Sequence, residues 1–231
     1  MSSELASRIR EGLLHREGVQ RIAPVRRGMI ITAPNSPGDS VHFVDSGYVK
    51  LVQKGADGKE VILLIIPPGS IFGEDSLYDN GARAVSAQMM QEGVIYQIPR
   101  SVFLAFAESA PEVFRGLCEL MAERQRDLEQ KIALLCLNDV EYRILHYLST
   151  LPATFHSSNA QESAIPLSQS ELAHLIGATR ETTSTTLNNL ARRGLVRLGR
   201  RMLMVTSMDA VRNAAHERSG ASAKVVASPN A

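Results

Sequence analysis

Residues 167–205, LSQSELAHLIGATRETTSTTLNNLARRGLVRLGRRMLMV, carry the clearest structural pattern in the C-terminal part of the chain. Ser168 can cap a helix in which Glu171 stands three positions later, the spacing of a capping box. Gly177 interrupts that helix, and Thr179 can cap a second one. Two short helices joined by a tight glycine turn make a helix-turn-helix, whose second helix enters the major groove of DNA. The apolar residues expected to face inward are Leu172, Leu175 or Ile176 on the first helix and Leu187 and Leu190 on the second.

The first two turns of the second helix carry side chains that can read bases. Arginine can donate two hydrogen bonds to one guanine, and glutamate can accept one from the amino group of cytosine. Serine and threonine hydroxyls can reach bases or phosphates, but they discriminate weakly between sequences. We therefore predict base contacts from Arg180, Glu181, Ser184 and Thr185.

Residues 194–205 predict two short strands around a turn at Gly199, which would complete a winged helix. The segment 186–205 contains five arginines and no acidic residue. A charge run is most often a solvated face, but arginines without counter-charges are also what phosphate contacts require. The predicted contacts to the DNA backbone come from Ser168, Gln169, Ser170, Thr179, Thr182, Arg200 and Arg201.

The composition of the whole chain excludes several classes of protein. Among 231 residues, 25 Lys and Arg against 24 Asp and Glu leave a net charge of +1, so the protein is not uniformly basic. The two cysteines, Cys118 and Cys136, form no CxxC motif, which argues against a disulfide framework or a zinc ribbon. The apolar run 61–68 is too short to span a membrane, and the N-terminus lacks the apolar core of a secretory signal. These features predict a cytoplasmic protein without a membrane partner.

Residues 19–100 read as β structure. The segment 41–53 predicts one strand, GADG at 55–58 a turn, and 59–67 a second strand, so that the two strands form a hairpin. Short strands separated by glycine and proline, without helical stretches between them, are typical of an antiparallel sandwich or barrel. Before them, residues 4–16 predict at most a short amphipathic helix.

The segment 111–137 predicts a long helix. Pro111 occupies a favoured first-turn position, with Ser109 as a candidate cap. Apolar residues follow an approximate heptad pattern, which indicates either packing on the helix's own domain or pairing with a second copy of the chain. We favour pairing and predict a weak seam, because Arg124 and Lys131 interrupt it. The predicted dimer residues are Leu117, Met121, Arg124, Leu128, Ile132 and Leu135.

The remaining segments complete a predicted domain order. Residues 139–151 predict another helix, 151–166 a loop or short hairpin, and 219–231 a disordered tail. The predicted parts are 1–110 as a sensing domain, 111–138 as a dimerisation helix, 139–218 as the DNA-binding domain and 219–231 as the tail.

This order of parts resembles the cyclic-AMP receptor protein / fumarate-nitrate regulator family of bacterial transcription factors. The likeness rests on PPGSIFGED (67–75), LNDVEYRILHYL (137–148) and the Arg180-Glu181-Thr182 run of the second helix. It implies an α+β fold: an N-terminal β-roll of the jelly-roll, cyclic-nucleotide-binding type, a long dimerisation helix and a winged helix-turn-helix. It also implies a homodimer on an inverted-repeat operator, control by an effector in the β-roll, and contact with RNA polymerase.

Thr185 departs from the pattern of this family. Its cyclic-AMP binders usually place another arginine at the matching position. Losing that arginine removes a strong guanine contact, worth about 1–3 kcal/mol of discrimination. The resemblance therefore implies a shifted or relaxed operator preference.

The effector pocket that the resemblance implies is altered. The family's cyclic-AMP binders hold the ribose with a Gly-Glu pair and the phosphate with an Arg-Ser or Arg-Thr pair. The adenine is touched by hydroxyls on the long helix. Here the implied pocket residues are Gly73, Glu74, Arg83, Ala84, Ser86, Leu128 and Glu129, where alanine, leucine and glutamate replace the hydroxyl residues.

These replacements lead us to expect a nucleotide other than cyclic AMP, a small metabolite, or activity without a ligand. Glu74 and Arg83 have a second interpretation, a salt bridge that closes the β-roll. Iron–sulfur sensing is not expected, because no cysteine precedes Cys118. His15 and His42, the histidines of this region, are only weak candidates for haem ligands. The two cysteines are expected to be buried packing thiols.

Two other functional classes compete with a DNA-binding regulator. An enzyme is not expected, because no HExxH, GxSxG or complete phosphate-loop motif occurs. A ligand-binding regulatory subunit that acts on a protein partner would explain the β-roll and the long helix. It would leave the Arg180-Glu181 face and the acid-free wing unexplained.

Overall fold

A computed structural model of the chain describes residues 3–78, 81–155 and 163–226. The chain divides into two compact units, Met1–Leu128 and Glu129–Ala231. The long helix α4 (Pro111–Leu137) contributes residues to both units.

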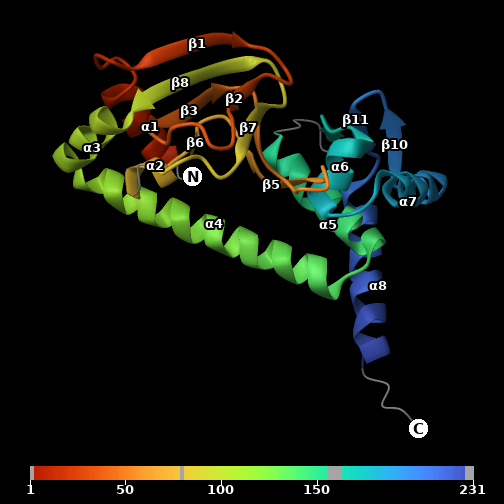
Figure 1. The fold of residues 1–231 in the computed structure, drawn as a ribbon. Helices are drawn as coiled ribbons and strands as arrows, with labels where there is room; N and C mark the ends of the chain where they lie inside the picture. The colour runs from red at the N-terminus through yellow and green to blue at the C-terminus, as the bar shows by residue number, and fades with distance from the viewer. Residues whose placement is uncertain (1–2, 79–80, 156–162, 227–231) are drawn as a thin grey trace. The chain divides into compact units, whose positions relative to one another are not determined.

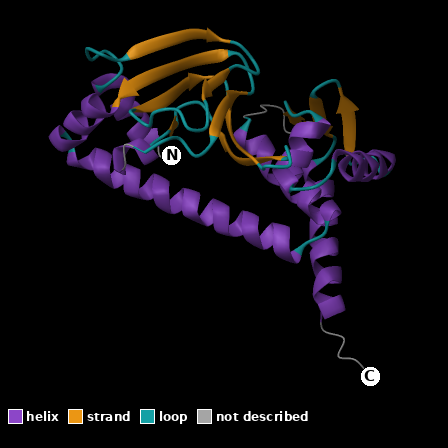
Figure 2. Ribbon diagram, in the orientation of Figure 1, coloured by secondary structure: helices purple, strands orange, loops and turns teal. Residues whose placement is uncertain are grey.

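The first unit contains two four-stranded antiparallel sheets that form the β-roll (Figures 1 and 2). One sheet has the order β1-β8-β3-β6, and the other has the order β2-β7-β4-β5. The strands are β1 (Gln20–Val25), β2 (Ile30–Thr32), β3 (Ser40–Ser46), β4 (Val49–Lys54), β5 (Glu60–Ile66), β6 (Ile71–Phe72), β7 (Ser86–Met89) and β8 (Gly93–Pro99). This arrangement confirms the predicted antiparallel β domain.

One detail of the strand prediction is wrong. Residues 41–53 do not form a single strand, because the chain turns at Gly47, where φ is 80°. A Cβ there would lie 3.0 Å from two backbone oxygens, those of Gln91 and Glu92, so a side chain does not fit. The turn sends β3 and β4 into different sheets. The predicted hairpin is formed by β4 and β5 alone.

The helices of the first unit are α1 (Ser3–Gly12), α2 (Asp75–Tyr78) and α3 (Arg100–Ser109). Helix α1 contributes more to the core than its sequence predicted. Leu5 and Ile9 of α1 are buried in one core cluster with Phe43 of β3 and Phe103 of α3. The amphipathic pattern of α1 is therefore used to cover a sheet. Helix α3 was not predicted.

Helix α4 has the predicted bounds, but its predicted cap is wrong. The hydroxyl of Ser109 donates to the carbonyl of Phe106 at 2.8 Å, inside the last turn of α3. Pro111 does stand at the first position of α4. Its missing N–H costs nothing there, because the first-turn N–H groups of a helix have no intrahelical acceptor.

The second unit contains the predicted winged helix-turn-helix. Its further helices are α5 (Val140–Thr154), α6 (Gln169–Ile176), α7 (Arg180–Arg192) and α8 (Met208–Val226). Strands β10 (Val196–Gly199) and β11 (Met202–Val205) form the wing hairpin. Strand β9 (Ser163–Ile165) pairs with β11 and makes a third strand of the sheet, so the segment predicted as a loop or short hairpin ends in a strand.

The predicted disordered tail is corrected in the same unit. Helix α8 runs from Met208 to Val226, so residues 219–226 continue a helix. Residues 227–231 lie outside the described part of the chain, as do residues 156–162 of the predicted loop. Val211 and Ala214 of α8 are buried, and α8 packs against α5.

Candidate nucleic-acid interface and effector pocket

Local hydrogen bonds build the turn between α6 and α7. Ser168 and Glu171 form a complete capping box: the backbone N–H of Glu171 donates to the Ser168 hydroxyl, and the Ser168 N–H donates to the Glu171 carboxylate. Gly177 ends α6 in the left-handed region, with φ 64°. Thr179 caps α7 by accepting a hydrogen bond from the N–H of Thr182 at 3.2 Å. All of these elements were predicted from sequence.

Packing directs one face of α7 inward and leaves the predicted reading face in solvent. Leu187 and Leu190 are fully buried against the rest of the second unit. Arg180, Glu181 and Thr185 are exposed, and Ser184 is half-buried. These side chains stand at the N-terminal end of the helix, which also favours contact with the negative charge of a phosphate.

The residues predicted to contact the DNA backbone differ in availability. Arg200 and Arg201 are exposed in the turn of the wing, where Arg201 adopts a left-handed conformation with φ 58°. Thr179 and Thr182 are exposed, and their hydroxyls lie 3.0 Å apart. Gln169 and Ser170 are half-buried at the start of α6. The Ser168 hydroxyl donates to Glu171 at 2.8 Å, so its own hydrogen is used in the cap.

Arg143 was not singled out by the sequence, yet it connects three segments. Its guanidinium donates to the carbonyl oxygens of Leu135 in α4, of Asn138 after α4 and of Ile176 at the end of α6, at 2.8, 3.0 and 3.1 Å. These carbonyls lie at helix ends, where intrahelical donors are missing. Arg143 therefore sets the position of the helix-turn-helix relative to the end of α4. No sequence rule identifies such a residue, because its acceptors are backbone atoms.

A second missed contact limits the basic surface. Arg193 at the end of α7 forms an ion pair with Glu141 of α5, with 2.6 Å between Nη1 and Oε1. Of the five arginines in the acid-free segment, Arg193 is therefore already paired within the unit.

The exposed apolar side chains of α4 follow the predicted periodicity. Phe114, Met121, Leu128 and Ile132 are 43, 40, 38 and 61% exposed. Two other residues of the predicted seam face elsewhere. Leu117 packs against the core of the β-roll, and Arg124 is buried. The remaining seam residue, Leu135, is half-buried.

Arg124 is bound to the β-roll rather than placed in a helix–helix seam. It donates to the carboxylate of Glu74 and to the carbonyl oxygen of Ile71. Burial lowers the pKa of Arg124 to about 10, a value at which the group is still charged at neutral pH. The prediction that Arg124 interrupts the exposed seam is therefore wrong. The expectation of buried thiols is also wrong, since Cys118 and Cys136 are both exposed.

The two charged residues of the predicted effector pocket, Glu74 and Arg83, have different ionic partners. Glu74 pairs with Arg124, whereas Arg83 pairs with Asp75 at 2.6 Å and donates to the carbonyls of Gly73, at 2.9 Å, and Ser40. The alternative interpretation was a salt bridge between Glu74 and Arg83. It is wrong, because the two residues do not pair with each other. Glu74 is instead bound to α4, and Arg83 is bound to α2 and β3.

The other predicted pocket residues occupy mixed environments. Ser86 is buried, and its hydroxyl has no hydrogen-bond partner among the described residues. One oxygen of Glu74, Oε2, is likewise buried without a partner there. Ala84, Leu128 and Glu129 are exposed. Gly73 has φ 78°, and a Cβ at this position would lie 2.7 Å from Nη1 of Arg83.

His42 of β3 lies beside this charged cluster. Its ring stacks on Phe72 with 4.8 Å between centroids. The pKa of His42 is lowered to about 4, mainly because the ring is buried and also because of the charge of Arg83, whereas Asp39 opposes both effects. The ring is therefore neutral at physiological pH. Its Nδ1 is buried without a hydrogen-bond partner among the described residues.

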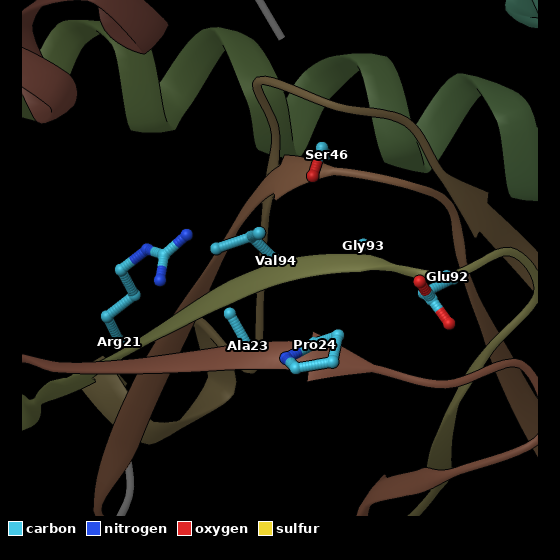
Figure 3. Close-up of a pocket in the computed structure, with 7 residues that line it drawn as sticks. All are labelled: Arg21, Ala23, Pro24, Ser46, Glu92, Gly93 and Val94. Carbon is cyan, nitrogen blue, oxygen red and sulfur yellow. The ribbon is translucent and has the colours of Figure 1, made fainter.

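A separate surface cavity of about 500 Å³ lies on the β-roll (Figure 3). It is lined by residues of β1, of β8, of the end of β3 and of the turn before β8: Arg21, Ala23, Pro24, Ser46, Glu92, Gly93 and Val94. None of the predicted effector residues lines this cavity. Within the described ranges, the His, Cys, Asp and Glu side chains form no group of three that could hold a metal ion. Those ranges also contain no helix that is long and apolar enough to cross a membrane.

Comparisons with known proteins agree with this architecture. A cyclic nucleotide-binding domain model matches residues 23–110, and a Crp-like helix-turn-helix domain model matches residues 142–214. The CRP-like cAMP-activated global transcriptional regulator of Mycobacterium tuberculosis is 31% identical over 185 residues, which cover 79% of this chain and 83% of that protein. The cyclic AMP receptor protein of Thermus thermophilus is 34% identical over 165 residues, which cover 70% of this chain and 73% of that protein.

A solved structure supports the same fold. FixK2 from Bradyrhizobium japonicum superposes with a TM-score of 0.73 at 22% identity, over 84% of this chain and 96% of that chain. At this identity the likeness concerns the fold alone. The family assignment comes from the two domain models and the more similar relatives. It favours DNA binding over the alternative of a regulatory subunit that acts on a protein partner without DNA. The chain belongs to the Crp/Fnr family of DNA-binding transcription regulators.

Proposed function

We propose that this protein is a homodimer that reads an inverted-repeat operator through two copies of α7. The observation that carries the proposal is the exposed face of α7, on which Arg180, Glu181 and Thr185 project from a helix whose opposite side is buried. Arg180 would bind guanine and Glu181 would accept from cytosine. Ser184 and Thr185 would add weaker contacts.

The wing and the helix starts would hold the DNA backbone. Arg200 and Arg201 are the charged side chains at the turn of the wing. Phosphate contacts of this kind set the register of the protein on the duplex but carry little sequence information. Thr179, Thr182, Gln169 and Ser170 would contribute neutral contacts, whereas Ser168 would act mainly through the cap of α6.

The exposed stripe of α4 supports pairing with a second copy. Phe114, Met121 and Leu128 recur every seven residues, and Ile132 follows four residues after Leu128. This spacing is that of a two-helix seam, in which branched and leucine side chains alternate. Two winged heads joined in this way would reach half-sites about one helical turn apart, roughly 34 Å.

Control through the β-roll forms the second part of the proposal. The charged cluster of Glu74, Arg124, Arg83 and Asp75 lies where the family resemblance places an effector. Arg124 connects this cluster directly to α4, so a ligand that changes the partner of Glu74 would act on the dimerisation helix. Such a ligand would bias a two-state equilibrium between DNA-competent and incompetent dimers. The dimer would act in the cytoplasm by contacting RNA polymerase.

Selection of bound duplexes from a random pool tests the proposal. The purified full chain, at physiological salt and without added ligand, is expected to enrich an inverted repeat. A parallel selection with Arg180→Ala should lose the preference at one position in each half-site. Enrichment of single, unpaired half-sites would contradict the dimer. An unchanged preference in the Arg180 variant would show that Arg180 does not read bases.

A further inference from the structure

We propose that Asp75 acts as a built-in anion that occupies Arg83, so that the β-roll discriminates against negatively charged effectors. This inference rests on the proposed role of the β-roll as the effector-sensing part. It concerns the charge of the ligand that the pocket can bind, and it assigns this selectivity to Asp75. The expected ligand class is neutral or cationic.

The hydrogen bonds of Arg83 are the first support. A guanidinium has five N–H donors and no acceptor. Nη1 donates to the carboxylate of Asp75 at 2.6 Å and to the carbonyl of Gly73 at 2.9 Å, which uses both of its hydrogens. Nη2 donates to the carbonyl of Ser40. A phosphate can therefore form a paired contact with the two terminal nitrogens only after it displaces one of these acceptors. One hydrogen of Nη2 and the N–H of Nε remain, and Nε is buried without a hydrogen-bond partner among the described residues.

The close fit around Arg83 is the second support. Nη1 sits so near Gly73 that any Cβ there would lie 2.7 Å away, and Gly73 has the positive φ that glycine tolerates. The guanidinium is therefore seated in a backbone cradle. Asp75 adds the one full negative charge among the three acceptors of this cradle.

The difference in exposure between Arg83 and Asp75 is the third support. The Arg83 side chain is 3% exposed, whereas that of Asp75 is 62% exposed. The pair is thus buried at its cationic end and open at its anionic end. An anion that approaches from the open side meets the carboxylate of Asp75 before it reaches the guanidinium.

Both arginines of the charged cluster, Arg83 and Arg124, have a carboxylate partner. Glu74 neutralises Arg124, and Asp75 neutralises Arg83. Asp39 adds a further negative charge that acts on His42, which burial keeps neutral at physiological pH. A ligand with a phosphate would bring an uncompensated negative charge into a partly buried site, where like-charge repulsion is weakly screened.

Direct binding measurements test the inference. Isothermal titration would compare cyclic AMP with adenosine, its uncharged counterpart, on the full chain and on the Asp75→Asn variant. The wild-type chain is expected to bind cyclic AMP no better than adenosine. Asp75→Asn is expected to raise the affinity for cyclic AMP by roughly tenfold or more, and to leave that for adenosine unchanged, because one opposing charge at contact distance is removed.

Asp39→Asn provides the matched control. It removes a carboxylate that acts on His42 and does not pair with Arg83, so a smaller gain for cyclic AMP than that of Asp75→Asn is expected. Circular dichroism spectra show that each variant is folded, and Asp75→Ser is a second neutral variant should Asp75→Asn be unstable. Tight binding of cyclic AMP to the wild type, or no gain in a folded Asp75 variant, overturns the inference. Neither result depends on DNA binding, which the duplex selection measures separately.

Discussion

Arg218 of α8 and Asp139, which stand 79 positions apart in the sequence, form a hydrogen-bonded ion pair, with 2.6 Å from Nη2 and 3.0 Å from Nε to the same carboxylate oxygen. The other oxygen of Asp139 accepts the backbone N–H of Tyr142 at 2.9 Å and caps α5. One aspartate thus joins the start of α5 to α8. The segment predicted as a tail begins directly after this arginine.

Replacing Arg218 with alanine is expected to lower the stability of the second unit by about 0.5–1 kcal/mol, the range for a well-formed but exposed ion pair. Thermal unfolding followed by circular dichroism measures the loss. Arg212→Ala is the control, because Arg212 is also exposed on α8 but pairs locally with Asp209 at 3.8 Å. An equal loss in both variants would mean that the charge itself, and not the link to Asp139, matters.

The same pair has a defined pH dependence. Partial burial would raise the pKa of Asp139, but the hydrogen bonds from Arg218 and from the N–H of Tyr142 outweigh burial and hold the pKa below its usual value of 3.8. A lowered pKa stabilises the fold above the unfolded value and loses that effect as the pH falls through the folded value. The difference between wild type and Arg218→Ala should therefore be full at pH 7 and shrink below about pH 3.8.

His42 is expected to make the β-roll sensitive to mild acid. Its pKa falls from 6.5 to about 4 because the ring is buried, with Arg83 adding to the effect and Asp39 opposing it. The unfolded chain takes up a proton near pH 6.5 and the folded chain does not, so stability decreases as the pH falls from 6.5 to 4. The expected loss is about 3 kcal/mol.

Nuclear magnetic resonance titration of the imidazole signals measures the pKa of His42 directly. Hydrogen exchange of the β3 amides measures the accompanying loss of stability. His42→Phe keeps a ring that can stack on Phe72 but cannot titrate, so its exchange rates should lack this pH dependence. A His42 ring that titrates near 6.5 would contradict the prediction.

Arg180 and Arg200 are expected to contribute to DNA binding in different ways. Arg180→Ala should weaken binding to the selected operator by about 1–3 kcal/mol and remove the preference at one base pair. Arg200→Ala should weaken binding to all duplexes nearly equally and reduce the slope of log K against log salt by about 1. Fluorescence anisotropy at several salt concentrations separates the two effects. Identical salt slopes and identical loss of specificity would contradict this division of roles.

Leu128→Glu is expected to break the dimer. A carboxylate buried without a partner in a helix–helix seam should cost at least about 3 kcal/mol, or roughly 100-fold in the dissociation constant. Gln130→Glu adds the same charge two residues later, at an exposed position outside the seam, and should leave the dimer intact. Sedimentation velocity gives the mass of each variant. A stable Leu128→Glu dimer would remove Leu128 from the interface.

The sequence alone determined the helix-turn-helix because its signals are local. Ser168 and Glu171, Gly177, and Thr179 with Thr182 act within three or four residues of one another, so their spacing implies their contacts. The bounds of α4 follow equally from Pro111 and from the regular recurrence of apolar residues. Short-range geometry leaves few alternatives for such segments.

Which charged residues pair with one another depends on the tertiary structure. Glu74 pairs with Arg124, 50 positions away, while Arg83 takes Asp75 as its partner. The sequence placed Arg124 in an exposed seam, because spacing along a helix does not reveal which side a sheet will cover. The packing of α4 within the first unit brings the carbonyl of Ile71 and the carboxylate of Glu74 to the arginine. Ion pairs between distant segments are chosen by packing, since packing determines which cations lose water and must find an acceptor.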